Sequence, residues 1–356
     1  MFRSARVFLP YLAFVLSGLP NMGHAYSACV GTSTELDAAM SQATATTDAT
    51  ITIKIREGTY TATAGNSFYL NLAHSNQTVD LSGGWSGAAC ASRRYGAESG
   101  TVLVGSTSAA ALQLNAGLGT SGNTVNATDL TLRNTDGIQN DAVGACLHVL
   151  VNPGSTARVY RMRLDGCVGY SAAILNNSSG DLTFANSVVH GGFNAGAPVY
   201  LHTNNGVNRL AQLSITANTS TTASPDASGL YVLADAGPAS QTTLDNSVVW
   251  GGIAVAGTPD ILTNGSGIVF SRVHYEIRSF INATITDNQP SHGDPGFLSP
   301  TNPRLRADSL LVDSGVPISI GGARDVDGNV RFQGAAVDVG AYERIPDRIF
   351  ADGFDH

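Results

Sequence analysis

The sequence is poor in positive charge and has no basic run. Lys54 is the only lysine and the arginines are scattered, so 19 basic residues stand against 27 acidic ones and the net charge is −8. Because an acidic surface repels phosphate groups, we expect no nucleic-acid partner and no binding to anionic lipid.

Long apolar runs are also missing after the N-terminal segment. Residues 1–25 combine positive charge at Arg3 and Arg6 with an apolar run over Val7–Leu19, which is typical of a secretory signal peptide. The run is shorter than the roughly 20 apolar residues that span a bilayer, and it contains Pro10. We therefore expect an exported protein whose mature chain begins after residue 25 and contains no transmembrane helix.

Cysteine is scarce, with four residues that all lie in the expected mature chain. An even number of cysteines in an exported protein predicts two disulfides. The pairings nearest in sequence join Cys29 with Cys90 and Cys146 with Cys167. A metal site is the alternative, but no two cysteines have the short spacing of zinc ligands.

Aromatic residues make up only 7% of the chain, whereas glycine is abundant with 40 residues. This composition would suit a disordered chain if apolar residues were also rare, but they amount to 43%. The composition therefore predicts an all-β fold of many short strands and tight turns.

Only one segment has helical periodicity. Between residues 34 and 43, apolar residues recur on one helical face, with Thr34 as the expected cap. The alternating strand Ile51–Ile55 follows it. We expect this helix to cover the open apolar end of a stack of strands, as the terminal caps of solenoids do.

One short segment occurs twice. Asn186–Gly192 reads Asn-Ser-Val-Val-His-Gly-Gly, and Asn246–Gly252 repeats it with Trp250 in place of His190. Apolar residues that end comparable units recur with a period of about 25 residues. They are Leu132, Leu164, Val189, Ile215, Val249 and Val273.

A fixed long period favours a parallel β-helix, in which each turn stacks on the last at about 4.8 Å. Parallel crossovers are strongly right-handed, so we expect a right-handed parallel β-helix over residues 26–290, with the helix as its N-terminal cap. A sandwich of hairpins would instead show short Asn-Gly turns without a long period.

Four motifs follow residue 290 in order. They are His292–Phe297, Leu305–Gly315, Arg324–Arg331 and Val337–Glu343. Their order resembles the C-terminal module of choice-of-anchor Q domain proteins, which are secreted or surface proteins of bacteria with a right-handed, pectin-lyase-like β-helix. The resemblance implies a C-terminal module over residues 291–343. The tail, residues 344–356, is similar to an ending of exported proteins in some Gram-negative bacteria, which implies an extracellular or outer-membrane-surface location.

The segment Asn134-Thr135-Asp136-Gly137 is the first candidate for chemistry. It matches the first motif of polygalacturonase-type hydrolases, in which paired carboxylates act as acid and base. The other motifs of these enzymes are absent, and Asp165 is the nearest acid one turn later. Local hydrogen bonding in a turn explains the segment without catalysis, and we favour that interpretation.

A polysaccharide lyase would need a base and a cation that neutralises the uronate carboxylate. Arg161 and Arg163 alternate around Met162 and lie about one turn before His190, so the three side chains could share an outward face. A solvated strand face is the alternative interpretation, and we favour it.

Calcium is the one cofactor that the sequence suggests. Asp325, Asp327 and Asn329 resemble an oxygen-ligand loop, although the distant glutamate of an EF-hand is missing and an Asx turn explains the same residues. We expect an exported scaffold that binds surface components or extracellular glycans. The alternative is a lyase or glycoside hydrolase that acts on acidic polysaccharide.

Overall fold

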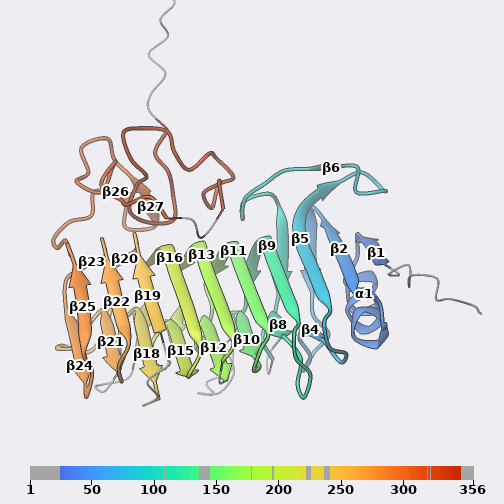
Figure 1. Cartoon of the computed structure of the whole chain (residues 1–356). Helices are drawn as coiled ribbons and strands as arrows, with labels where there is room; N and C mark the ends of the chain where they lie inside the picture. The colour runs from blue at the N-terminus through green and yellow to red at the C-terminus, as the bar shows by residue number, and fades with distance from the viewer. Residues whose placement is uncertain are drawn as a thin grey trace, which may run out of the picture.

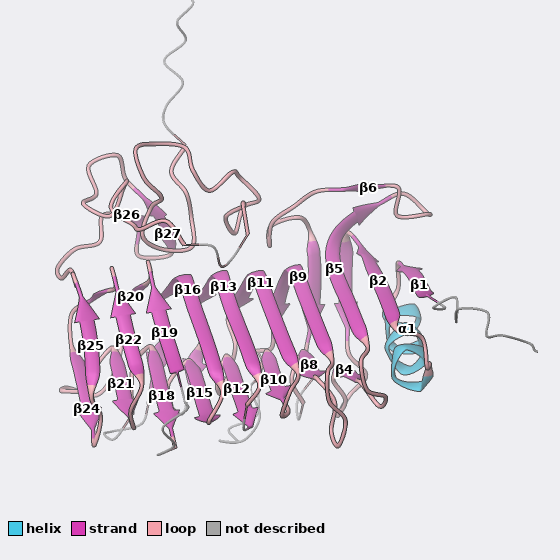
Figure 2. Cartoon of the chain, in the orientation of Figure 1, coloured by secondary structure: helices cyan, strands magenta, loops and turns pink. Residues whose placement is uncertain are grey.

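The computed structural model describes residues 25–345, except for residues 107–108, 136–144, 178, 195, 222–225, 236–240, 319 and 321. Within these residues the regular structure is one helix and many strands (Figure 2). The all-β prediction is therefore confirmed. The expected signal peptide, Asp136 and residues 346–356 lie outside the described part of the chain.

The strands form two large sheets that run along the molecule (Figure 1). The larger sheet has the order β1 (Ala25–Val30), β2 (Thr50–Arg56), β5 (Thr78–Ser86), β9 (Thr124–Arg133), β11 (Thr156–Asp165), β13 (Asp181–His190), β16 (Val207–Thr216), β19 (Gln241–Asp245), β22 (Ile268–Ser271) and β25 (Ile285–Asn288). Beside this path lie β3 (Gly58–Thr61), β6 (Ser92–Arg93), β7 (Thr101–Val104), β20 (Val248–Trp250) and β23 (His274–Tyr275).

The smaller sheet has the order β24 (Arg278–Ile281), β21 (Ile261–Asn264), β18 (Leu230–Ala234), β15 (Val199–Asn204), β12 (Ala172–Asn177), β10 (Leu147–Val151), β8 (Leu112–Asn115) and β4 (Phe68–Asn71). Two short pairs complete the strands: β14 (Phe193–Asn194) with β17 (Thr219–Ser220), and β26 (Phe297–Ser299) with β27 (Asn302–Leu305). Among the described strand pairs, only β5–β6 and β26–β27 are antiparallel. This parallel stacking confirms the predicted β-helix.

The repeat positions found in the sequence stack on one another. Leu132, Leu164, Val189, Ile215 and Val249 are consecutive partners on β9, β11, β13, β16 and β20, and all are buried. The predicted sixth repeat position, Val273, was wrong, because Val249 pairs with Tyr275. Both residues are buried, so apolar character alone did not separate them.

The strands β9, β11, β13 and β16 each bend at one residue in the left-handed backbone conformation, and the next two coils have such a residue directly after β19 and β22. We call these residues the corner ladder; their φ values lie between 45° and 62°. The ladder consists of Asp129, Arg161, Asn186, Gln212, Asn246 and Arg272. Because a strand reverses its alternation at such a residue, the segments before and after the corner face different sides of the coil.

The N-terminal end of the stack is closed by α1 (Ser33–Ala45). The four predicted apolar residues, Leu36, Ala39, Met40 and Ala43, are its buried residues, so the capping role is confirmed. The N-cap, however, is Thr32 and not Thr34, since the Thr32 side chain accepts a hydrogen bond from the Glu35 amide at 3.2 Å. The strand β1, which the sequence did not predict, pairs with β2 beside the helix.

The opposite end of the stack is closed by a charged pair. Arg278 and Asp287 take the places of the inward residues Ile261 and Phe270 of the preceding coil, and they form an ion pair across the end of the core. The Tyr275 hydroxyl donates to Asp287 at 2.5 Å, and the Arg278 guanidinium lies over the Phe270 ring at 6.0 Å. Inward charges end the apolar ladder and protect the open strand edges from pairing with another molecule.

After β25 the chain does not continue the stack but folds back along its side (Figure 1). We call residues 291–343 the C-terminal module and residues 87–100 the flap. The module buries the outward side chain of Val248, and the flap and module together bury that of Val188. The amide of Ala97 in the flap donates to the carbonyl of Val326 in the module at 2.7 Å, so the two segments meet above the strands.

Both predicted disulfides are present. Cys29 is bonded to Cys90, which anchors the flap to β1, and Cys146 is bonded to Cys167 on the same coil. Among the described residues no helix is long and apolar enough to cross a membrane.

Replacing the charged end cap with apolar residues should cause association between molecules. We expect the double variant Arg278→Leu, Asp287→Val to form concentration-dependent oligomers, because it exposes an apolar core end beside the unpaired edges of β24 and β25. Sedimentation velocity measures this. The control, Arg209→Leu with Asp181→Val, removes an exposed ion pair on the side of the stack and should sediment like the wild type. Equal behaviour of the two double variants would contradict this role of the cap.

Candidate functional site

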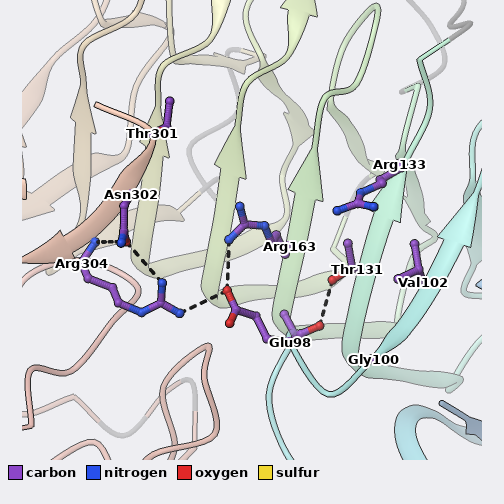
Figure 3. A pocket seen from close by; sticks show the side chains of 10 residues that line it. Glu98, Gly100, Val102, Thr131, Arg133, Arg163, Thr301, Asn302 and Arg304 are labelled. Carbon is purple, nitrogen blue, oxygen red and sulfur yellow. Dashed lines mark hydrogen bonds and ion pairs between the residues drawn. The ribbon is translucent and has the colours of Figure 1, made fainter. Parts of the chain in front are cut away.

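One cavity is assembled from three separate parts of the chain. Its volume is about 440 Å³, and it opens between the flap, the outward face of β9 and β11, and the β26–β27 hairpin of the C-terminal module (Figure 3). The principal lining side chains are Glu98 from the flap, Thr131, Arg133 and Arg163 from the strands, and Asn302 and Arg304 from the module. We call it the arginine cavity.

Arg133 lies on the floor and is held by Asp165 on the neighbouring strand. The Arg133 guanidinium donates to one oxygen of Asp165 through Nε at 3.2 Å and Nη2 at 2.9 Å. Its side chain is still 50% exposed, so its remaining N–H groups face solvent. The pairing orients the guanidinium without filling its capacity to donate hydrogen bonds.

Asp165 also contacts His190 and Arg163. The distance from Asp165 Oδ1 to His190 Nδ1 is 3.6 Å, at the outer limit of a hydrogen bond, and Arg163 Nη2 lies 3.8 Å away. These contacts with His190, Arg163 and Arg133 lower the pKa of Asp165 to about 2 although burial opposes them. Asp165 is therefore a fixed negative charge behind the arginines at any ordinary pH.

Glu98 joins the flap to both other walls of the cavity. Its Oε1 lies 3.3 Å from Arg163 Nη1 and 3.1 Å from Arg304 Nη2 (Figure 3). Arg304 also forms a bidentate ion pair with Asp327: Nε donates to Oδ2 at 2.9 Å and Nη2 donates to Oδ1 at 2.8 Å. Arg163 donates to the Tyr342 hydroxyl at 3.4 Å. The arginines are thus positioned by carboxylates that come from different segments.

Arg161 does not share this face, and the predicted grouping of Arg161 with Arg163 and His190 was wrong. Arg161 is a residue of the corner ladder, so the alternation between Arg161 and Arg163 is broken by its left-handed backbone, φ 52°. Its guanidinium pairs instead with the fully buried Asp129, at 2.5 and 3.0 Å. Arg163, Asp165 and His190 do lie together on one outward face.

Asp129 is also the anchor of the flap. Its carboxylate accepts hydrogen bonds from the Arg93 guanidinium at 2.5 Å and from the Gly96 amide at 2.7 Å. The Arg93 guanidinium and the Gly96 amide belong to the flap, whereas Arg161 belongs to the next coil. One buried carboxylate therefore ties the stack to one wall of the arginine cavity.

The segment that resembles a hydrolase motif has a structural role at its first residue. Asn134 is fully buried, and its side-chain amide donates to the carbonyls of Ala109 and Ala145, both at 2.9 Å. Asp136 lies outside the described residues. These carbonyls belong to residues 25 and 11 positions away, so the Asn134 side chain joins separate segments of the coil rather than closing a local turn.

The suggested calcium loop is already occupied by hydrogen-bond donors. Asp325 Oδ1 accepts from the amides of Asp327 at 3.1 Å and Asn329 at 2.7 Å, and Oδ2 accepts from the Glu343 amide at 3.0 Å. Asp327 pairs with Arg304, and burial raises its pKa to about 6. Within the described residues no group of three or more His, Cys, Asp or Glu side chains could hold a metal ion. The geometry is that of an Asx turn.

Arg133, Glu98 and Arg304 were not among the predicted site residues. Arg133 follows the inward Leu132 as Asp165 follows Leu164, so the repeat itself carried a signal for this residue. Glu98 belongs to the flap and Arg304 to the module. Neither segment has a sequence repeat, so no local pattern predicts the position of these two residues in the fold.

The arrangement can bind an anion but is poorly suited to removing a proton. Guanidinium groups offer several N–H donors in one plane to a carboxylate and have no acceptor atom. Both ring nitrogens of His190 are buried, so a ligand in the cavity does not reach them directly. The site is therefore a set of fixed donors on a rigid floor.

Removing the charge of Asp129 should destabilise the protein. Asn tolerates the left-handed corner, but Asp129→Asn leaves two partly buried guanidinium groups without their anion, and we expect a loss of about 3 kcal/mol in the free energy of unfolding. Denaturant titration measures it. Asp181→Asn, which alters an exposed carboxylate 3.7 Å from Arg209, should change it by less than about 1 kcal/mol. Equal losses would show that Asp129 is not such an anchor.

Comparisons with known proteins identify a fold neighbour and no family. No protein-family model matches the sequence, so the resemblance to the choice-of-anchor Q module is not supported by that comparison. No curated protein matches it either. Among solved structures the chain is similar to pectate lyase Pel9A, with a TM-score of 0.39 and 12% identity over 85% of this chain and 90% of that chain. At this similarity the activity of the neighbour says nothing about the activity of this chain.

Proposed function

We propose that the protein is an exported β-helix protein that binds an acidic glycan in the arginine cavity. The observation that carries this proposal is the convergence of Arg133, Arg163 and Arg304 on one cavity from β9, β11 and β27. A chain of uronate sugars presents a carboxylate on each unit, and arginine is the residue best suited to hold carboxylates through paired hydrogen bonds.

Charge makes this cavity distinct from the rest of the surface. The whole chain has a net charge of −8, whereas the charged side chains that line the cavity are three arginines and Glu98. Asp165 and Asp327 lie behind the arginines and orient them. The net charge thus disfavours an acidic polymer on the protein as a whole, whereas the cavity offers guanidinium donors to its carboxylates.

Export to the cell surface or beyond it is part of the proposal. It is supported by the signal-like residues 1–25 and by two disulfides, which persist in oxidising compartments. The resemblance of residues 291–343 to a module of bacterial surface proteins agrees with that location.

A polysaccharide lyase is the second candidate, because the Asp165–His190 pair lies beside the arginines. Such an enzyme would use one cation to neutralise the uronate carboxylate and a free base to remove a proton. The buried ring nitrogens of His190 and the acid-paired arginines favour binding over catalysis. A glycoside hydrolase would need two carboxyl groups free to reach the bond.

Loss of Arg133 should weaken binding of acidic glycans. We expect Arg133→Gln to lower the affinity for oligogalacturonate by about tenfold, since it removes one charged pair of hydrogen bonds from a half-exposed site. Isothermal titration at low ionic strength measures this. Arg158→Gln, on the exposed face of β11 before the corner, where the strand faces another side of the coil, should bind like the wild type. Equal weakening by both variants, or no binding by the wild type, would refute the proposal.

Removal of Glu98 should have the opposite effect. Its carboxylate competes with a ligand for Arg163 and Arg304, so Glu98→Gln should tighten binding of oligogalacturonate by several-fold. The same titration, repeated at higher salt, should show a smaller difference. Unsaturated chain ends that appear on incubation with wild type and not with Arg163→Gln would establish the lyase alternative instead.

A further inference from the structure

A second cavity lies at the N-terminal end of the stack, where nothing proposed so far places a ligand. Its volume is about 570 Å³, within the range of small-ligand sites. One wall is the outward side of α1 with Asp37, Ser41 and Thr44, and the other is the loop that contains Asn66. Tyr69 of β4 and Gln113 of β8 also line the cavity.

The cavity is built on a rigid frame. Thr44 donates to the Met40 carbonyl at 3.1 Å and accepts from the Asn71 amide at 3.4 Å, which joins the helix to β4. Ser106 donates to the Asn66 carbonyl at 2.9 Å, which fixes the loop on the other side. The shape therefore does not depend on a ligand.

Tyr69 presents an aromatic ring to this space. Its side chain belongs to the outward row of the smaller sheet and is 44% exposed, although it is large and partly apolar. Gln113 is the partner of Tyr69 in the sheet register. Its amide nitrogen is hydrogen-bonded to His148 Nδ1 at 2.8 Å, which leaves the amide oxygen of Gln113 as an acceptor. An apolar ring face beside amide and hydroxyl groups suits a ligand with one apolar and one polar side.

Asp37 is the one charged group among the lining side chains. Burial raises the pKa of its carboxyl group, and Asp37 forms no ion pair with any described residue. An unpaired carboxylate accepts hydrogen bonds from hydroxyl groups and repels other carboxylates. The cavity therefore selects against the acidic sugars that the arginine cavity attracts.

We propose that this cavity binds a hexopyranose unit of a neutral glycan, whose ring stacks on Tyr69 and whose hydroxyl groups bond to Asp37 and Gln113. A pyranose ring has an apolar C–H face and a polar hydroxyl rim, which match the two sides of the cavity. This inference does not depend on the arginine cavity, and a failure of either proposal leaves the other standing.

The test is a titration of the secreted protein with β-1,4-linked hexasaccharides of glucose, mannose and galactose, and with oligogalacturonate as competitor. At least one neutral hexasaccharide should bind, and Tyr69→Ala should lower its affinity by about tenfold. Asp37→Asn should lower it by several-fold. Tyr95→Ala, a tyrosine of similar exposure, 42%, on the flap, should bind like the wild type.

Tyr69→Phe keeps the ring and should retain most of the affinity, which separates loss of stacking from loss of folding. Oligogalacturonate should not displace the neutral ligand. The proposal is overturned if none of the three neutral hexasaccharides binds, if binding survives Tyr69→Ala, or if oligogalacturonate displaces the neutral sugar.

Discussion

The structure from β9 onward depends on the left-handed residues at which successive coils turn. A left-handed conformation costs about 1–2 kcal/mol for a residue with a side chain, and here Asp, Asn, Gln and Arg residues adopt it in successive coils. As a result, their polar side chains form a line along one corner of the stack. Asp129 pairs there with Arg161, and Asn246 bonds to both the amide and the carbonyl of Val316. The corner thus shapes the coil and also attaches what covers it.

Two segments outside the repeat are held along that corner, and their positions create the site. The flap is fixed by Asp129 and by the disulfide to Cys29, while the module is fixed through Asn246 and through Ser214, which accepts from the Ala341 amide at 2.9 Å. Between them one stretch of strand face remains open. The arginine cavity is that opening, so its walls are as well defined as the anchors that hold them.

The two cavities differ in charge, and this difference bears on function. The arginine cavity offers N–H donors that are oriented by carboxylates, whereas the cavity beside α1 offers a tyrosine ring and an unpaired carboxylate. Under the two proposals the first cavity binds acidic sugars and the second binds neutral ones, so one scaffold would hold two kinds of glycan at separate places.

The regular part of this protein was readable from the sequence, because the spacing of Leu132, Leu164, Val189, Ile215 and Val249 reports the coil directly. The capping helix followed from periodicity, and the even cysteine count predicted two disulfides; the pairs that form are those nearest in sequence. The corner at Arg161 could not be predicted from the sequence, because nothing in the residue pattern indicates its left-handed backbone. This backbone interrupts the alternation of the strand, so Arg161 and Arg163 face different sides. The arginine cavity needed the tertiary structure for a different reason. Glu98 and Arg304 lie far apart in segments without a repeat, and only their folding onto the corner brings them to the repeat face.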